Sequence, residues 1–117
     1  MKSFVPYEEA RKQTGAVLIE FYASWCPHCQ RMMPIVDEVR ELLGEQAPVY
    51  QYDIDKFSQA ASEAGVESVP TFIIYDNDRE VWRHVGEISG DDLVARVEAV
   101  MTNTVIPRLS DSEHPSA

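Results

Sequence analysis

Apolar side chains along this chain recur at two spacings, one typical of buried strands and one typical of helices. Residues 16–23 form an almost continuous run of apolar, β-type side chains interrupted by Glu20, as expected for a strand covered on both faces. After Cys29 the apolar spacing becomes helical, and Gly44 supplies a stop. We expect Pro34 to kink this helix. Its predicted apolar stripe consists of Met33, Ile35, Val36, Val39, Leu42 and Leu43.

The same patterns continue through the rest of the chain. Two β-rich segments, residues 71–75 and 80–85, are separated by Asp-Asn-Asp-Arg at 76–79, which predicts an antiparallel hairpin. A right-handed crossover would make the first two strands parallel. The other expected elements are a helix over 7–13, a strand over 49–54, a short helix over 58–64 closed by Gly65, and a last helix that starts at Ser89 and carries Leu93, Val97, Val100 and Met101.

Length and charge narrow the class of protein. The chain has 117 residues, 44% of them apolar, which suits one domain. We expect residues 1–103 to form that domain and residues 104–117 to form a polar, flexible tail. Twenty acids against ten bases give a charge of −10, so repulsion disfavours binding to nucleic acid or an anionic membrane. No apolar run approaches the ~20 residues of a membrane span, and a soluble monomer is expected.

The composition of the amino terminus gives an indication of the cellular compartment of the protein. It lacks the apolar segment of roughly 7–15 residues found in secretory leaders, which favours a cytoplasmic location. A periplasmic or other extracytoplasmic domain whose leader has been removed is the alternative. Two cysteines in one close pair are too few for a disulfide-stapled secreted scaffold, so the pair requires another explanation.

The stretch Trp25-Cys26-Pro27-His28-Cys29 joins the first strand to the following helix. Cys26 falls near the helix amino terminus, where unpaired N–H groups and the helix dipole stabilise a thiolate. Pro27 suits the first helical position, and Cys29 follows one turn later, close enough to close a small ring. This arrangement predicts that Cys26 attacks a disulfide and that Cys29 resolves the mixed disulfide, with no cofactor beyond this redox-active pair.

Two other interpretations of the cysteine pair are weaker. A zinc site requires four ligands, and the histidines at 28, 84 and 114 lie at no ligand spacing from one another. A purely structural disulfide would close a loop too short to remove much entropy from the unfolded chain. The position between a strand and a helix favours redox chemistry.

With these residues in view, the chain resembles the thioredoxin family over residues 4–103. The resemblance implies a thioredoxin fold of the α/β class, with a central mixed sheet of four to five strands flanked by helices. It also implies a cis Val69–Pro70 bond, disulfide-containing or dithiol protein substrates, and a reductase or oxidase partner. Beyond the cysteine motif it rests on Phe21, Ala23, Trp25, Pro34, Asp55, Val69-Pro70-Thr71 and Gly86.

The resemblance also suggests how substrate is bound. Pro70 would lie against the cysteine pair, and the Val69 backbone would pair with an extended substrate segment by strand addition. Trp25 would cover the site and contact the partner, and Gly86 completes the expected substrate-binding set. The alternatives are an ordinary turn proline at Pro70 and a core aromatic at Trp25.

Glu20 is an acid in an otherwise apolar strand, and an isolated buried carboxylate is costly unless it is protonated or paired. The resemblance implies that it accepts the proton of Cys29; its stretch is similar to that of protein disulfide isomerases, whereas thioredoxins mostly carry Asp. An acid that reaches solvent at a strand edge is the alternative. Gln51 stands where thioredoxins commonly carry a lysine, so either Glu20 is more often neutral or another cation, such as Lys56, substitutes.

Pro27 and His28 differ from the Gly-Pro of ordinary thioredoxins and match strongly oxidising periplasmic enzymes of the DsbA type. Those two classes differ by ~150 mV, about 7 kcal/mol for two electrons. His28 could donate to, or charge-pair with, the Cys26 thiolate, so we predict a more oxidising protein than ordinary thioredoxin. A solvated His28 without effect is the alternative. The resemblance to DsbA-type enzymes ends at this motif and Val69-Pro70. Those enzymes carry a large helical insertion, and the short span between Tyr52 and Pro70 cannot hold it.

These observations predict a protein-disulfide oxidoreductase whose physiological direction of electron flow stays open. An exported disulfide oxidase or isomerase-like domain is the alternative within this class. A thioredoxin-fold binding module that recruits a partner without turnover is the alternative from another class.

Overall fold

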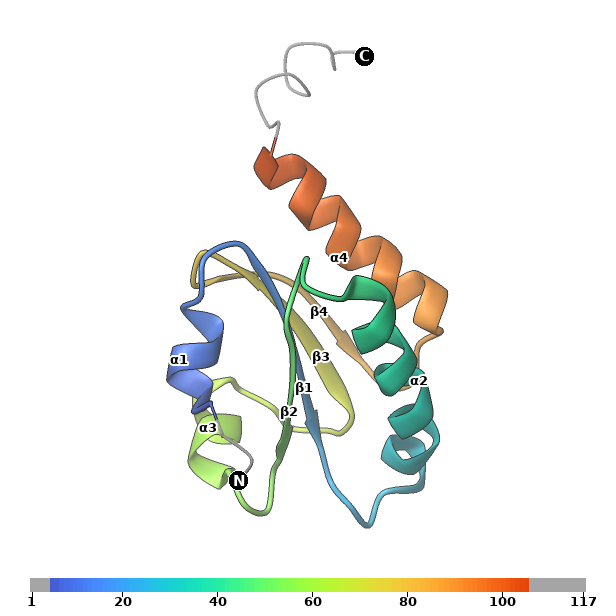
Figure 1. The fold of residues 1–117 in the computed structure, drawn as a ribbon. Coiled ribbons are helices and arrows are strands. Elements are labelled where there is room, and N and C mark those ends of the chain that lie inside the picture. Colours follow the sequence, from blue (N-terminus) through green and yellow to red (C-terminus); the bar gives the residue numbers. More distant parts are fainter. Residues whose placement is uncertain (1–4, 106–117) are drawn as a thin grey trace.

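The computed structural model describes residues 5–105. A four-stranded mixed sheet in the order β2-β1-β3-β4 lies between α2 and α4 on one face and α1 and α3 on the other (Figure 1). This arrangement confirms the expected α/β architecture, with four strands. The elements are α1 (Tyr7–Arg11), β1 (Ala16–Tyr22), α2 (Pro27–Leu43), β2 (Val49–Asp53), α3 (Ser58–Glu63), β3 (Thr71–Asp76), β4 (Arg79–Val85) and α4 (Gly90–Val105).

β1 lies inside the sheet, parallel to β2 and antiparallel to β3. Because side chains alternate along a strand, Leu18 joins the core cluster beneath α2 and α4, whereas Val17 and Ile19 join the cluster on the α1 side. Both faces are therefore covered, as the continuous apolar run predicts. The same alternation turns Glu20 toward the face on which Leu18 lies, the α2 side of the sheet.

α2 begins immediately after Cys26 and presents one buried stripe to the sheet. Its buried residues follow a 3-4-3-4 spacing and are Cys29, Met32, Val36, Val39 and Leu43. The predicted stripe was wrong at two positions, because Met33 is 39% exposed and Leu42 is 60% exposed. Met32, one residue earlier, takes the core position. The helix continues through Pro34 to Leu43.

The hairpin between β3 and β4 turns at Asn77 and Asp78, both with positive φ, as tight hairpin turns require. α4 extends to Val105, two residues beyond the expected end of the domain at 103, and residues 106–117 of the expected tail lie outside the described residues. Within residues 5–105, no helix is long and apolar enough to cross a membrane.

Candidate active site

The paired cysteines lie where β1 gives way to α2. Cys26 is the residue before the first helical position, with extended backbone, and Pro27 begins the helix. The Cys26 N–H donates to the Ala23 carbonyl at 3.2 Å, which closes the connecting turn. Both cysteines are free thiols. Cys26 is 6% exposed and Cys29 is 1% exposed, so the first cysteine is the one within reach of a partner.

The environments of the two thiols drive their pKa values apart. Hydrogen bonding from the Cys29 backbone N–H is the largest cause that lowers the Cys26 pKa, followed by a side-chain hydrogen bond from Cys29, the His28 backbone N–H and the charge of Arg31. The Cys29 pKa is raised to about 12, mainly by burial, and the charges of Cys26 and Glu20 contribute to this increase. Cys26 is therefore the thiol that ionises first, and Cys29 stays protonated.

Val69 and Pro70 face this thiol. Their peptide bond is cis, as the resemblance implied, and the Cys26 Sγ lies 3.9 Å from the Val69 carbonyl oxygen. The Gly86 N–H donates to the Pro70 carbonyl at 2.8 Å, which ties the loop after β4 to this segment. The structure thus brings together Cys26, Val69, Pro70 and Gly86.

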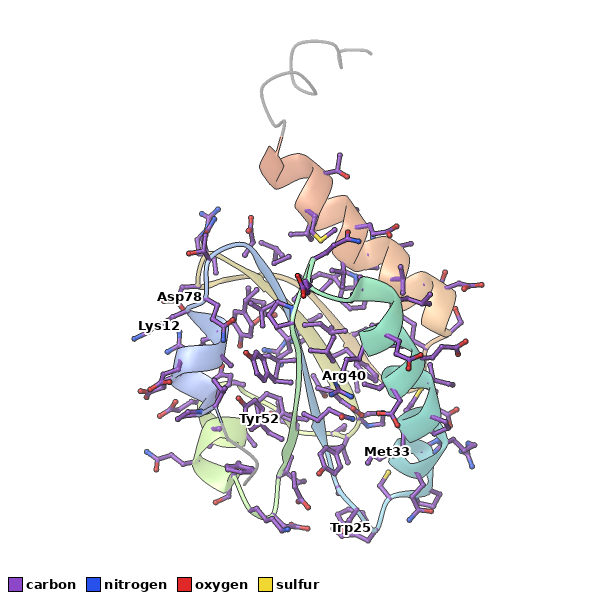
Figure 2. The ribbon with its side chains drawn as sticks, viewed as in Figure 1. Lys12, Trp25, Met33, Arg40, Tyr52 and Asp78 are labelled. Atoms are coloured by element: carbon purple, nitrogen blue, oxygen red, sulfur yellow. The ribbon has the colours of Figure 1, made fainter. Side chains whose placement is uncertain are left out.

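Trp25 projects from the loop between β1 and α2 at one end of the molecule (Figure 2). It is 63% exposed, which excludes a core aromatic. Its indole N–H donates to the Asp55 carboxylate at 2.9 Å. Trp25 also lines a groove of about 340 Å³ together with Cys26 and Val69, so an apolar wall lies beside the Cys26 thiol.

Glu20 is completely buried on the central strand β1, which excludes an acid that reaches solvent at a strand edge. Burial raises its pKa from the ordinary 4.5 to about 7, against the lowering effects of a hydrogen bond from Gln51 and the charge of Arg40. A carboxyl group with a pKa near neutrality can both accept and release a proton at physiological pH. Its charge also acts on Cys29.

The cation that acts on Glu20 is Arg40, which was not among the residues singled out from the sequence. Arg40 reaches from α2 toward β2 (Figure 2), where it donates to the Gln51 side-chain oxygen at 2.9 Å. Lys56, the cation considered from the sequence, instead lines a separate pocket of about 290 Å³ beside Cys29. The sequence contains one sign of the position of Arg40: it follows Met33 by seven residues, which places both side chains on one face of the helix.

His28 lies in an exposed cluster with Arg31 and Glu87. Its Nδ1 is 2.7 Å from Glu87 Oε2, and Arg31 donates to the same oxygen at 2.7 Å. Because a carboxylate only accepts, the contact with Glu87 is a hydrogen bond in the tautomer whose Nδ1 carries a proton. In that tautomer the 3.0 Å contact with Arg31 joins two donors that share one acceptor. The ring therefore bonds to Glu87, and His28 acts on Cys26 through its backbone N–H.

Residues 5–105 contain no group of three or more His, Cys, Asp or Glu side chains that could hold a metal ion.

A dithiol at a helix amino terminus, facing a cis-proline segment in a β2-β1-β3-β4 sheet, defines a domain of the thioredoxin fold. The thioredoxin family model matches residues 5–99. The chain therefore belongs to the thioredoxin family.

Individual relatives agree with this assignment. "Thioredoxin Y, chloroplastic" from Oryza sativa subsp. japonica is 35% identical over 101 residues, which cover 86% of this chain and 60% of that protein. The thioredoxin of Malassezia sympodialis is 31% identical over 68% of this chain and 80% of its own length. A solved mutant thioredoxin from Halobacterium salinarum NRC-1 is 32% identical, with a TM-score of 0.72 over 79% of this chain and 80% of that one.

Three chloroplastic thioredoxins of the Y type are considerably longer than this chain, which spans 60%, 49% and 59% of their lengths.

Proposed function

We propose that this protein is a protein-disulfide oxidoreductase that cycles Cys26 and Cys29 between dithiol and disulfide. The observation that carries this proposal is the opposite displacement of the two thiol pKa values, lowered at Cys26 and raised to about 12 at Cys29. Only a thiolate attacks a disulfide. Cys26 is therefore the sulfur that attacks the substrate, and Cys29 stays protonated until the mixed disulfide is resolved.

In the reducing direction, the Cys26 thiolate attacks one sulfur of a substrate disulfide. The S–S bond of the substrate breaks, the first substrate sulfur, which is the one not attacked, leaves as a thiolate, and Cys26 is joined to the second sulfur, the one that it attacked. Cys29 then loses its proton and attacks Cys26 Sγ, which releases the second substrate sulfur. The substrate has gained two electrons, and the protein has lost two in forming the Cys26–Cys29 disulfide. The reverse sequence would insert a disulfide into a dithiol substrate.

Glu20 is the proton acceptor for Cys29 in this cycle. Part of the cause that raises the Cys29 pKa is the negative charge of Cys26. Once Cys26 is held in a mixed disulfide, its sulfur is neutral and this contribution disappears, so Cys29 becomes easier to deprotonate at that stage. A carboxyl group with a pKa of about 7 is suited to take that proton near neutral pH.

Substrates are proteins that present an extended segment to the groove beside Cys26. The exposed Trp25 and the Val69 backbone, both lining that groove, support an apolar contact together with main-chain pairing. The electron partner is a separate reductase or oxidase. The plant relatives bear the word chloroplastic in their names, so the cytoplasmic location expected from the amino terminus stays a prediction.

The protein is also more oxidising than ordinary thioredoxin. Stabilisation of the Cys26 thiolate favours the reduced form and so raises the reduction potential. Arg31 and the helix N–H groups supply that stabilisation, and Glu87 holds the Arg31 guanidinium in place. A titration against glutathione buffers should give a potential above roughly −270 mV. A value at or below that figure would refute this part of the proposal, and a Pro27→Gly, His28→Pro double variant should lower the potential.

Two cysteine variants test the activity itself. With insulin as substrate and a dithiol as electron source, the wild type should turn over and Cys26→Ser should not, since it lacks the attacking sulfur. Cys29→Ser should also fail to turn over but should accumulate a mixed disulfide with a model substrate, visible by mass spectrometry. A wild type that binds substrate without turnover, and a Cys26→Ser variant that binds equally well, would instead establish the binding module.

A further inference from the structure

Only one of the two carboxyl oxygens of Glu20 has a hydrogen-bond partner among the described residues. The parallel register pairs Glu20 on β1 with Gln51 on β2, and the Gln51 side-chain Nε2 donates to Glu20 Oε1 at 2.8 Å. Glu20 Oε2 is also buried but has no hydrogen-bond partner among the described residues. The two oxygens of one buried carboxyl group thus have different environments, which is unusual because buried polar atoms are nearly always paired.

The orientation of the Gln51 amide follows from its neighbours. Arg40 has only donors, and its Nη2 lies 2.9 Å from Gln51 Oε1, so the amide oxygen must face Arg40. The amide nitrogen then faces Glu20 and also lies 3.7 Å from Met33 Sδ. The flipped amide would set donor against donor at Arg40 and acceptor against carboxylate at Glu20.

Two further hydrogen bonds hold Arg40 in the position from which it contacts the Gln51 amide. Its guanidinium donates to the Asp37 carboxylate at 3.1 Å and to the Val49 carbonyl oxygen at 3.3 Å. One contact is to its own helix, and the other is to the strand that carries Gln51. Arg40 therefore links α2 to β2 and holds a positive charge one amide away from Glu20.

We propose that Arg40, acting through the Gln51 amide, fixes which oxygen of Glu20 takes the proton of Cys29 when the mixed disulfide is resolved. Oxygen Oε1 always faces an N–H and cannot carry a proton without setting donor against donor. The proton therefore goes to Oε2 and leaves from it. Arg40 is a positioning residue: it touches neither sulfur and acts only through the amide and its charge. This inference rests on the proposed role of Glu20 as the proton acceptor.

The Arg40 charge also makes the ionised form of Glu20 more favourable. An Arg40→Met variant keeps much of the length of the side chain but loses the charge and the donors, so the Gln51 amide is free to turn over. Glu20 should then hold its proton to a higher pH. Arg40→Lys restores the charge and one donor and should restore most of the wild-type behaviour.

The matched control is Arg83→Met. Like Arg40, Arg83 pairs with an acid three residues earlier, Glu80, and donates to backbone carbonyls, here those of Ala64 and Gly65. It makes no contact with Gln51 or Glu20 among its hydrogen bonds to the described residues. Arg83→Met therefore reproduces the general loss of an arginine without touching the proposed relay.

The experiment follows the Glu20 side-chain carbon by ¹³C NMR as a function of pH in the reduced protein, and in parallel the rate at which a preformed Cys26 mixed disulfide is resolved. In Arg40→Met, the Glu20 midpoint should rise by about one pH unit, and resolution on the acid side should slow about tenfold. Arg83→Met should change neither. A second variant, Gln51→Met, should raise the midpoint as well, since it removes the amide while Arg40 stays.

An unshifted Glu20 midpoint in Arg40→Met would overturn the inference, whatever the rate does. A Glu20→Gln variant that resolves the mixed disulfide at the wild-type rate at every pH would overturn the proposed role of Glu20 instead. In that case the NMR midpoint still decides whether Arg40 sets the charge of Glu20, so the two failures are distinguishable.

Discussion

The buried carboxyl group of Glu20 should make this protein less stable as the pH rises, and replacement by Gln should remove that dependence. Burial raises the Glu20 pKa from 4.5 in the unfolded chain to about 7 in the folded protein. Between these two values the folded state binds a proton that the unfolded state has lost, so stability falls with increasing pH. The effect is absent below 4.5 and complete above about 7.

The size of the effect follows from the same two values. Each pKa unit corresponds to about 1.4 kcal/mol, so the rise from 4.5 to about 7 corresponds to about 3 kcal/mol of lost stability. This is a substantial share of the roughly 5–15 kcal/mol typical of a folded domain. Gln is neutral at every pH and therefore resembles the protonated acid.

The assay is urea unfolding of the reduced wild type and of Glu20→Gln at pH values from about 4.5 to 8. At low pH the difference in stability between variant and wild type also contains the effect of placing an amide at a buried position. The informative quantity is therefore the change of this difference with pH. The difference in the free energy of unfolding between Glu20→Gln and the wild type should change by about 3 kcal/mol in favour of the variant from the lowest to the highest pH of the assay. A change below about 0.5 kcal/mol would contradict a Glu20 pKa of about 7 in the folded protein, because ordinary surface substitutions reach that size.

Glu80→Gln supplies a control of opposite sign. A hydrogen bond from Arg83 lowers the Glu80 pKa, so Glu80 contributes stability above its ordinary pKa that is lost as the pH falls. The Glu80→Gln variant should therefore be at its greatest disadvantage at high pH, where Glu20→Gln has its greatest advantage.

Two further predictions concern the thiol and the core. Arg31→Met should raise the pKa of Cys26, because the Arg31 charge is one of the causes that lower it; ultraviolet absorbance of the thiolate against pH measures this, and an unchanged or lower midpoint would contradict it. Leu93→Ala should cost about 2–5 kcal/mol in denaturant unfolding, since Leu93 is fully buried where α4 meets the sheet, whereas the exposed Leu42→Ala should stay within about 0.5 kcal/mol.

Local signals predicted the path of the chain well. The continuous apolar run, the Asp-Asn-Asp-Arg turn and the strand-to-helix position of Cys26 correspond to β1, the β3–β4 hairpin and the start of α2. The error in α2 is instructive. Met32 and Met33 are equivalent in hydrophobicity, and the choice between them depends on which face of the helix meets the sheet, a property that the local sequence does not set.

Part of the site was also accessible from sequence. The roles proposed for Cys26 and Cys29 follow from the physics of a helix amino terminus, and an acid within an apolar strand singled out Glu20. The partners of these groups were not accessible. Arg31 and Glu87 are 56 positions apart, and Arg40 reaches Gln51 across 11 positions; neither pairing has a local signature.

The amino-acid sequence is enough to locate the paired thiols and to predict that Cys26 is the better thiolate, because the spacing of the cysteines and their place at the start of a helix fix that difference. The electrostatics around the two thiols depend on contacts that form only in the folded protein. Parallel pairing of β1 with β2 places Gln51 beside Glu20, and packing of α2 on the sheet supplies Arg40. Burial and charge act through distances in space, and residues distant along the chain acquire those distances only when the strands pair and the helices pack.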